Sequence, residues 1–216
     1  MGELVEVHPE TGPVVLSGDG KLVVTASFDN TAILWNAGDG KQLHTLRHTA
    51  HIMDVATSND GKLVATGAAD GTVILWESGS GKALRTLEGR TRAINCVSLS
   101  TDGKVLASGS SSGKAVVWET ASGKQLRTFE GDYQWVSSAS LSGDGKLLAT
   151  VGGFINPPAI LWDVDKGKKL HTFGSVARVR LSGDGKYVVT YTGSPVDIWD
   201  SATGKKLHSL KVSLPR

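Results

Sequence analysis

Residues 63–89 read LVATGAADGTVILWESGSGKALRTLEG, and they contain the clearest copy of a pattern that runs through the chain. Two short apolar runs, Leu63–Thr66 and Val73–Trp76, flank an Asp-Gly pair. A turn with a Gly-Lys pair then leads into a run that alternates between apolar and polar residues. An Asp-Gly pair favours a tight hairpin because glycine accepts a positive φ without a Cβ clash. The stretch therefore predicts three consecutive antiparallel strands.

The pattern recurs five times along the chain. The pentapeptide Ser-x-Asp-Gly-Lys ends at residues 21, 62, 104, 146 and 186, which gives periods of 41, 42, 42 and 40 residues. An apolar run ending in tryptophan follows each pentapeptide, and the lysine of a Gly-Lys pair stands six residues beyond each tryptophan. Repeats of this length with four short strands are typical of propeller blades. We therefore predict an all-β protein of five four-stranded antiparallel blades.

On these residues the sequence resembles the WD-repeat β-propellers. The resemblance covers nearly the whole chain, but it indicates the fold rather than the function, because this fold hosts many functions. It implies a hydrogen-bonded structural set in blade 2, made of His48, Thr66, Asp70 and Trp76, and the set is degenerate in the other blades. The tryptophans that close the third strand of the other blades are expected to be structural as well: Trp35, Trp118, Trp162 and Trp199.

Because the repeat runs through the whole chain, we expect residues 1–216 to form a single domain. The expected blades are residues 13–47, 50–88, 92–130, 134–174 and 175–212, and residues 3–8 could supply a closing strand. The chain has five repeats, whereas members of the family that it resembles more often have seven. The first expectation is a closed five-bladed ring, and the alternatives are an open arc completed by another chain and a fragment of a larger propeller. A strand left over from closure would offer its edge to another chain.

The composition and charge of the chain argue against several functional classes. The 216 residues include 23 basic and 21 acidic ones, so the net charge of +2 does not indicate nucleic-acid or membrane binding. The single cysteine, Cys96, permits no internal disulfide, and no apolar run approaches the ~18 residues of a membrane span. The first residues, MGELVEVHPE, lack the apolar core of a signal peptide. We expect a soluble, cytoplasmic protein.

No motif predicts catalysis, a cofactor or a metal site, and a hydrolase ranks last among the alternatives. Residues 109–113, GSSSG, match G-x-S-x-G but fall on a hairpin rather than on a strand-to-helix turn. His48 and His51 have no further metal ligand at suitable spacing.

Arg178 and Arg180 are expected to line the central channel, opposite water or an anion. About ten turn lysines gather on one face, which predicts a solvated surface or, alternatively, a polyanion site.

Blade 4 departs from the repeat in a way that suggests a partner site. The spacing from Lys146 to Trp162 is 16 residues, whereas three other blades have 14 at this place. The extra length falls in the connection between the second and third strands (the b–c loop). The loop that enters the same blade (the d–a loop) carries Tyr133 and Trp135. Both kinds of loop leave the sheet opposite the lysine turns, and we call that side the loop face.

The sequence therefore predicts a non-catalytic protein–protein interaction scaffold or assembly subunit, which binds a protein or peptide partner through the loop face. The predicted partner-binding residues are Tyr133, Trp135, Phe154, Ile155 and Phe28. Exposed aromatic side chains on loops over a rigid scaffold often bind partners. Two alternatives stay open. Trp135 could instead plug a gap beside the shortened loop into blade 5, and the chain could be a structural subunit completed by oligomerisation or strand exchange.

Overall fold

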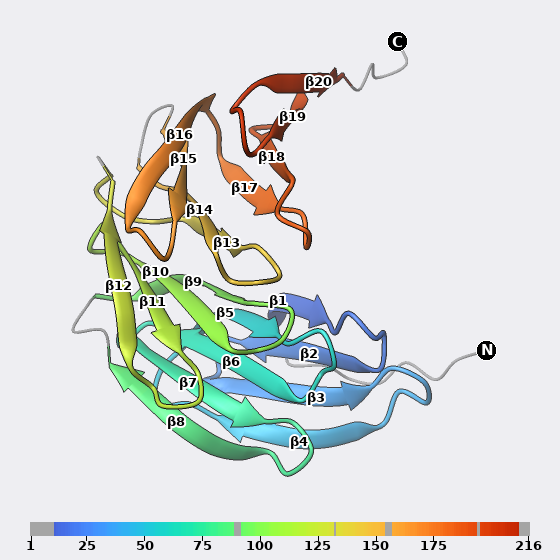
Figure 1. The fold of residues 1–216 in the computed structure, drawn as a ribbon. Coiled ribbons are helices and arrows are strands. Elements are labelled where there is room, and N and C mark those ends of the chain that lie inside the picture. Colours follow the sequence, from blue (N-terminus) through green and yellow to red (C-terminus); the bar gives the residue numbers. More distant parts are fainter. Residues whose placement is uncertain (1–10, 89–91, 132, 154–156, 194, 212–216) are drawn as a thin grey trace.

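The computed structural model describes residues 11–88, 92–131, 133–153, 157–193 and 195–211. Within these ranges the chain forms five antiparallel sheets of four strands, each sheet in simple sequence order (Figure 1). The prediction of an all-β protein with five four-stranded blades is confirmed. The possible closing strand at residues 3–8 lies outside the described residues.

The strands of each blade follow one another from the centre of the arrangement outward. Blade 1 contains β1 (Thr11–Leu16), β2 (Leu22–Ser27), β3 (Thr31–Asn36) and β4 (Gln42–Arg47). Blade 2 contains β5 (Ile52–Thr57), β6 (Leu63–Ala68), β7 (Thr72–Glu77) and β8 (Lys82–Glu88). Blade 3 contains β9 (Ile94–Leu99), β10 (Val105–Ser110), β11 (Lys114–Glu119) and β12 (Gln125–Glu130). Blade 4 contains β13 (Ser138–Leu141), β14 (Leu147–Val151), β15 (Pro158–Asp163) and β16 (Lys168–Ser175). Blade 5 contains β17 (Arg178–Leu181), β18 (Tyr187–Tyr191), β19 (Val196–Asp200) and β20 (Lys206–Leu210).

The Ser-x-Asp-Gly-Lys pentapeptide builds the turn between the first two strands of every blade. In blade 2 the Ser58 hydroxyl donates to Asp60 Oδ1 over 2.8 Å and accepts from the Leu63 amide over 3.0 Å. The Lys62 amide also donates to Asp60 Oδ1, and Gly61 has a φ of +66°. The same three hydrogen bonds recur in the other four blades. This regular turn explains why the pentapeptide repeats.

A second recurring bond fixes the tryptophan that ends the third strand. Its indole Nε1 donates to a Ser or Thr hydroxyl on the second strand at 2.8–3.3 Å in all five blades. The pairs are Trp35–Thr25, Trp76–Thr66, Trp118–Ser108, Trp162–Thr150 and Trp199–Thr190. Each bond satisfies a polar group that would otherwise be buried without a partner. Five of the six tryptophans therefore hold their own blades together.

The core lies between blades rather than within one sheet. Each blade has a forward face, which meets the next blade in the chain, and a rear face, which meets the preceding one. Between blades 1 and 2, Val24 and Leu34 of the forward face share a buried cluster with Val64 and Ile74 of the rear face. Three similar clusters join blades 2 to 3, 3 to 4 and 4 to 5. Apolar burial at these junctions provides most of the stabilisation of such a repeat array.

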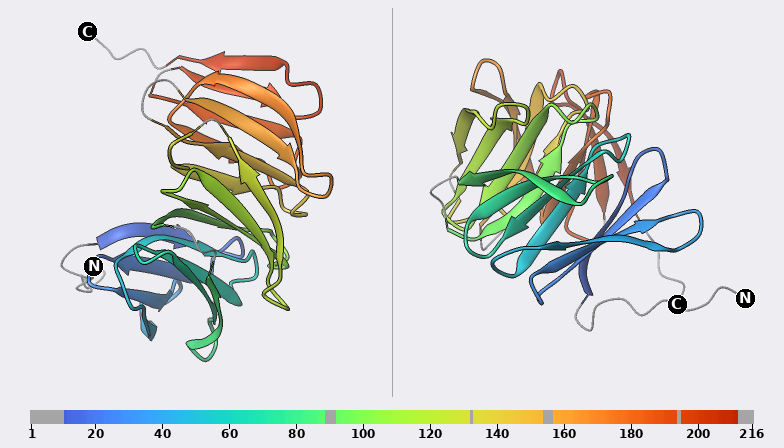
Figure 2. Two further views of the ribbon diagram at one scale, coloured as in Figure 1. Left: turned by 90° about the vertical axis from the view of Figure 1, so that its left-hand side faces the viewer. Right: turned by 90° about the horizontal axis from the view of Figure 1, so that it is seen from below.

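The blades follow an arc that is open between blade 5 and blade 1 (Figure 1). The left view of Figure 2 places the first and last blades at opposite ends of this arc. No buried apolar cluster among the described residues joins blade 5 to blade 1. The closed five-bladed ring is therefore not observed, and the open arc agrees with both expected alternatives, an arc completed by another chain and a fragment of a larger propeller.

Candidate functional site

The lysines of the Ser-x-Asp-Gly-Lys turns form ion pairs on the surface opposite the loop face. Each pentapeptide lysine lies within 2.8–4.0 Å of the aspartate of its own turn. The Lys104 side chain and amide lower the pKa of Asp102 to about 2, and those of Lys62 do the same for Asp60 together with the Ser58 hydroxyl. These carboxylates therefore stay ionised at neutral pH and offset the lysine charges. The ion pairs weaken the case for polyanion binding at this face.

The hydrogen-bonded set expected in blade 2 forms only in part. Trp76 donates to Thr66 over 2.9 Å, as the resemblance implies. Asp70, however, accepts from Thr49 and Thr72 rather than from His48. The Nε2 atom of His48 is buried without a hydrogen-bond partner, and burial lowers the pKa of His48. His48 is therefore neutral near pH 7.

Tyr133 is part of the blade 4 framework. Its hydroxyl lies 2.9 Å from Thr150 Oγ1, and the same oxygen accepts the indole hydrogen bond of Trp162 over 2.8 Å. The Tyr133 ring is half-buried and packs against the cluster between blades 3 and 4. A Cβ added at Gly131 would lie 2.3 Å from this ring, so only glycine leaves room for it. Tyr133 thus extends the Thr150–Trp162 pair, a role that the sequence did not reveal.

Trp135 lies on the loop face next to a tightly fixed backbone. The neighbouring Val136 amide donates to the Ser110 carbonyl over 2.9 Å, and Asn95 Nδ2 donates to the Val136 carbonyl over 2.9 Å. A Cβ added at Gly152 would lie 1.7 Å from the Trp135 carbonyl oxygen, so the loop can pass here only over a glycine. The backbone at Trp135 is therefore held by both blade 3 and blade 4.

Two hollows adjoin the half-buried Trp135 side chain. One has a volume of about 280 Å³ and is also lined by Ser137, Gly153, Pro157 and residues 176, 177 and 192 of blade 5. The other, of about 290 Å³, is lined by Asn95, Ser111, Trp135 and Ser137. Trp135 and Ser137 therefore line both depressions.

Phe28, which the structure describes, lies on a different blade from Trp135, between β2 and β3. Phe28 is 43% exposed on blade 1, and its ring meets the His51 ring edge-on at 6.1 Å. Phe154 and Ile155 lie outside the described residues, so their predicted place beside Trp135 stays a prediction. Of the predicted set, the structure places Tyr133 and Trp135 together on the loop that enters blade 4.

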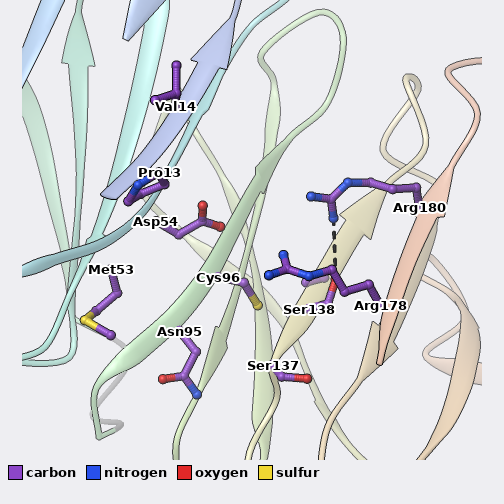
Figure 3. Close-up of a pocket in the computed structure, with 11 residues that line it drawn as sticks. Pro13, Val14, Met53, Asp54, Asn95, Cys96, Ser137, Ser138, Arg178 and Arg180 are labelled. Atoms are coloured by element: carbon purple, nitrogen blue, oxygen red, sulfur yellow. Dashed lines mark hydrogen bonds between the residues drawn. The ribbon is translucent and has the colours of Figure 1, made fainter. Parts of the chain in front are cut away.

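A polar cavity of about 430 Å³ lies at the centre of the arc, between the innermost strands of the five blades (Figure 3). Arg178 and Arg180 enter it from β17, while Pro13 and Val14 of β1 lie on the opposite side. Arg180 Nη1 lies 3.4 Å from the Ser138 hydroxyl. Both arginines are exposed to the cavity, as the sequence predicted for the channel lining.

Asp54 and Cys96 face the same cavity from blades 2 and 3. Asp54 Oδ2 accepts the Val97 amide over 2.8 Å, and burial raises the pKa of this carboxyl in spite of that bond and the two arginines. Burial likewise raises the pKa of the Cys96 thiol, so the thiolate is not populated at neutral pH. The cavity offers two guanidinium groups to an anion rather than an activated nucleophile.

Several other chemical possibilities find no support in the described part of the chain. No three His, Cys, Asp or Glu residues there are grouped to hold a metal ion. This part of the chain contains no helix that is long and apolar enough to cross a membrane. Ser111, the central serine of the G-x-S-x-G match, lies in the hairpin between β10 and β11, and its hydroxyl donates to Asn95 Oδ1 over 3.0 Å. This serine therefore belongs to a turn, as predicted.

Comparisons with known proteins agree with this architecture. The family model of the WD domain, G-beta repeat (WD40), matches residues 8–36, 40–77, 81–119 and 123–153. A solved structure of U3-55K, a WD-repeat propeller, is similar to the chain with a TM-score of 0.80 and 21% sequence identity. The match covers 95% of this chain and 66% of the U3-55K chain, so the present chain spans about two thirds of that length. No curated protein sequence matches the chain.

At 21% identity the structural similarity shows the fold alone, and the family model supplies the assignment. WD40 propellers are generally non-catalytic and typically bind protein partners, so at a general level this fold supports a protein-interaction scaffold. The family model matches more than half of the residues, and the five blades carry the recurring turn and tryptophan bonds of one repeat. The chain therefore belongs to the WD40 repeat family.

Proposed function

We propose that this protein is a non-catalytic scaffold that binds a protein or peptide segment on its loop face, with Trp135 as the apolar anchor. The observation that carries the proposal is that the half-buried Trp135 lines two hollows of about 280 and 290 Å³ on the loop face. Tryptophan is enriched among the residues that dominate binding energy, and the surrounding contacts of an interface exclude water from such residues. Phe28 lies on another blade and is not needed for this site.

The contacts that fix the Trp135 loop support a role for Trp135 in binding. The loop is tied to blade 3 through Ser110 and Asn95, and it passes over Gly152 without room for a side chain. Such a loop loses little conformational entropy when a partner binds, which raises the affinity gained from each contact. Tyr133 contributes to this support through Thr150 and is a positioning residue in the proposal.

The site also indicates the chemistry of the bound segment. Asn95 and Ser137 line both the second hollow beside Trp135 and the central cavity, so the two depressions are adjacent. The central cavity presents the guanidinium groups of Arg178 and Arg180. An apolar side chain at Trp135 followed by an acidic one at the arginines would satisfy both places, because carboxylates pair well with guanidinium. We therefore expect a segment with an apolar residue near an acidic residue.

Selection of a phage-displayed peptide library against the intact protein tests the proposal. We expect selected peptides to combine apolar and acidic residues, and Trp135→Ala to weaken their binding about tenfold or more in calorimetry. Arg178→Glu should weaken the acidic peptides and spare variants that lack the acidic residue. Phe28→Ala removes an exposed aromatic ring on another blade and serves as the control, with a change of no more than about twofold.

Two results would contradict the proposal. Equal affinities of Trp135→Ala and the wild type would place the binding site elsewhere. A large fall in the thermal midpoint of Trp135→Ala would support the alternative that Trp135 is a structural plug. Circular dichroism of both variants distinguishes a lost contact from a lost fold.

A further inference from the structure

Asn95 is the extra residue of a β-bulge on the innermost strand of blade 3. The residues on either side of it pair with β10, Ile94 with Ser110 and Cys96 with Gly109, and Asn95 itself is skipped. A bulge bends its strand and re-aims a side chain, and bulges are over-represented next to active sites. The Asn95 side chain lines both the hollow of about 290 Å³ on the loop face and the central cavity.

Blade 2 has the same bulge with a different side chain. The residue skipped in β5 is Met53. A thioether has no hydrogen-bond donor and only a weak acceptor, whereas the primary amide of asparagine has two donor and two acceptor positions. The bulge therefore belongs to the repeat, and blade 3 places a hydrogen-bonding side chain on it.

Two hydrogen bonds fix the Asn95 amide. Its Nδ2 donates to the Val136 carbonyl over 2.9 Å, and the Ser111 hydroxyl donates to its Oδ1 over 3.0 Å. A carbonyl can only accept, so the amide nitrogen must face Val136, and this sets the orientation of the group. Ser111 belongs to the hairpin of blade 3, and Val136 belongs to the loop that carries Trp135. The central serine of the G-x-S-x-G match thus orients Asn95.

The fixed amide keeps one donor and one acceptor position for a ligand. An asparagine side chain has two N–H donors and an oxygen with two lone pairs, and the two bonds to Val136 and Ser111 use one of each. Asn95 is half-buried, and Figure 3 shows its amide in the wall of the central cavity. The remaining N–H and lone pair can therefore be reached from the two depressions that Asn95 lines.

Three adjoining depressions differ in the chemistry of their walls. The hollow toward blade 5 is largely apolar, with Pro157 and Val176 beside Trp135. The other described residues that line the hollow over blade 3 with Trp135 all have polar side chains; they are Asn95, Ser111 and Ser137. The central cavity, which shares Asn95 with that hollow, holds the arginines of β17. An elongated ligand that runs from the apolar hollow to the arginines therefore passes over Asn95.

We propose that Asn95 binds the main chain of the peptide segment that the loop face recognises. Its remaining N–H donates to a peptide carbonyl, and its oxygen accepts a peptide N–H. The segment binds in an extended form, because an extended chain leaves its N–H and C=O groups free for such bonds and points successive side chains in opposite directions. This inference rests on the proposed function and adds the conformation of the segment and the residue that binds its main chain.

The proposed contact also explains how the site could tolerate different sequences. Main-chain groups are the same in every residue, so bonds to Asn95 do not select a side chain. Selectivity then comes from the apolar residue beside Trp135 and from the acidic residue at the arginines. We expect peptides selected on the intact protein to vary freely between these two positions. Because the Asn95 amide is already held in place, it loses little conformational entropy on binding.

Deletion of single peptide N–H groups tests the inference. The probe is a synthetic copy of the tightest-binding peptide from the selection described above, together with copies in which one amide at a time is replaced by an ester. An ester lacks the N–H but keeps the shape of the backbone. We expect one ester between the apolar and the acidic residue to weaken binding to the wild type by about fivefold or more in calorimetry. In Asn95→Ala, where the acceptor is absent, the same ester should change the affinity by less than about twofold.

Ser111→Ala is the matched control variant. It removes the hydroxyl that orients Asn95 and leaves the Asn95 amide in place, so the ester should still weaken binding. Because Asn95→Ala can disturb the Trp135 loop, a second measurement uses the wild type. The two side-chain N–H signals of Asn95 in a ¹H–¹⁵N spectrum are identified by their loss in Asn95→Asp. Addition of the amide peptide should shift the signal of the N–H that does not bind Val136.

The outcomes separate this inference from the proposed function. An equal effect of every ester on the wild type and on Asn95→Ala would overturn the inference, because Asn95 would then act only by supporting the loop. Unchanged Asn95 side-chain signals on peptide addition would overturn it as well. In both cases a peptide that still depends on Trp135 leaves the proposed function in place. If no peptide binds, or if Trp135→Ala binds as tightly as the wild type, the proposed function and this inference both fail.

Discussion

The hydroxyl of Tyr133 lies 2.9 Å from the hydroxyl of Thr150, and this contact ties the loop that enters blade 4 to the second strand of that blade. Thr150 also accepts the indole hydrogen bond of Trp162, so one threonine joins the loop to the blade tryptophan. The loop that carries Trp135 is therefore supported from within the core. This support makes the position of Trp135 a property of the fold.

Tyr133→Phe should lower the free energy of unfolding by about 1 kcal/mol, because it removes the hydroxyl and keeps the packed ring. The measurement is urea denaturation followed by tryptophan fluorescence. Tyr187→Phe is the matched control, since Tyr187 is 43% exposed at the far end of the arc, and it should change stability by less than about 0.5 kcal/mol. Equal effects of the two variants would contradict a structural role for Tyr133.

Gly152→Ala should be among the most damaging single-methyl substitutions in the chain. The added Cβ would lie 1.7 Å from the Trp135 carbonyl oxygen, so the loop must shift. We expect a loss of about 2 kcal/mol or more in the free energy of unfolding, together with weaker peptide binding at Trp135. Gly174→Ala is the control because nothing lies within 4 Å of its added Cβ. Normal binding by a stable Gly152→Ala would show that the Trp135 loop does not need its observed path.

The turn aspartates predict a loss of stability in acid. The pKa values of Asp60 and Asp102 fall to about 2 in the folded protein, below the ordinary value of about 4. Their ionised forms therefore stabilise the fold above about pH 4, and this contribution disappears as the pH falls through about 2. Asp54, with a raised pKa, acts in the opposite sense. In the Asp60→Asn, Asp102→Asn double variant, the free energy of unfolding should fall less between pH 4 and pH 2 than in the wild type, as measured by urea denaturation. An equal fall in the two proteins would show that these carboxylates do not stabilise the fold.

The sequence was sufficient to predict the blades, because the turn and the tryptophan of each repeat act locally. The Ser-x-Asp-Gly-Lys turn forms from bonds within six residues, and the same residues produce the same bonds in every blade. The bond from the tryptophan to a Ser or Thr hydroxyl was expected from the resemblance only for Trp76 and Thr66 of blade 2. In the other four blades it was missed, although a fixed spacing offered a signal. The acceptor precedes the tryptophan by 10 residues in blades 1 to 3.

Other features depend on distances that a repeat pattern does not encode. Closure depends on the small angle between adjacent blades summed over the whole arc, so no single residue indicates it. Leu210 is an apolar residue at a repeat position that is buried in the other blades, and only the structure shows that its side chain is exposed. Tyr133 resembles a surface aromatic in sequence, since its partner Thr150 lies 17 residues further along the chain.

The most direct test of the proposed function uses the six tryptophans themselves. Protein labelled with 5-fluorotryptophan gives a ¹⁹F signal for each tryptophan, and Trp135→Phe identifies one of them. On addition of a selected peptide, we expect the Trp135 signal to shift while the five indoles bound to Ser or Thr hydroxyls stay unchanged. A peptide that binds without moving the Trp135 signal, or that shifts a blade tryptophan instead, would contradict the placement of the partner site at Trp135.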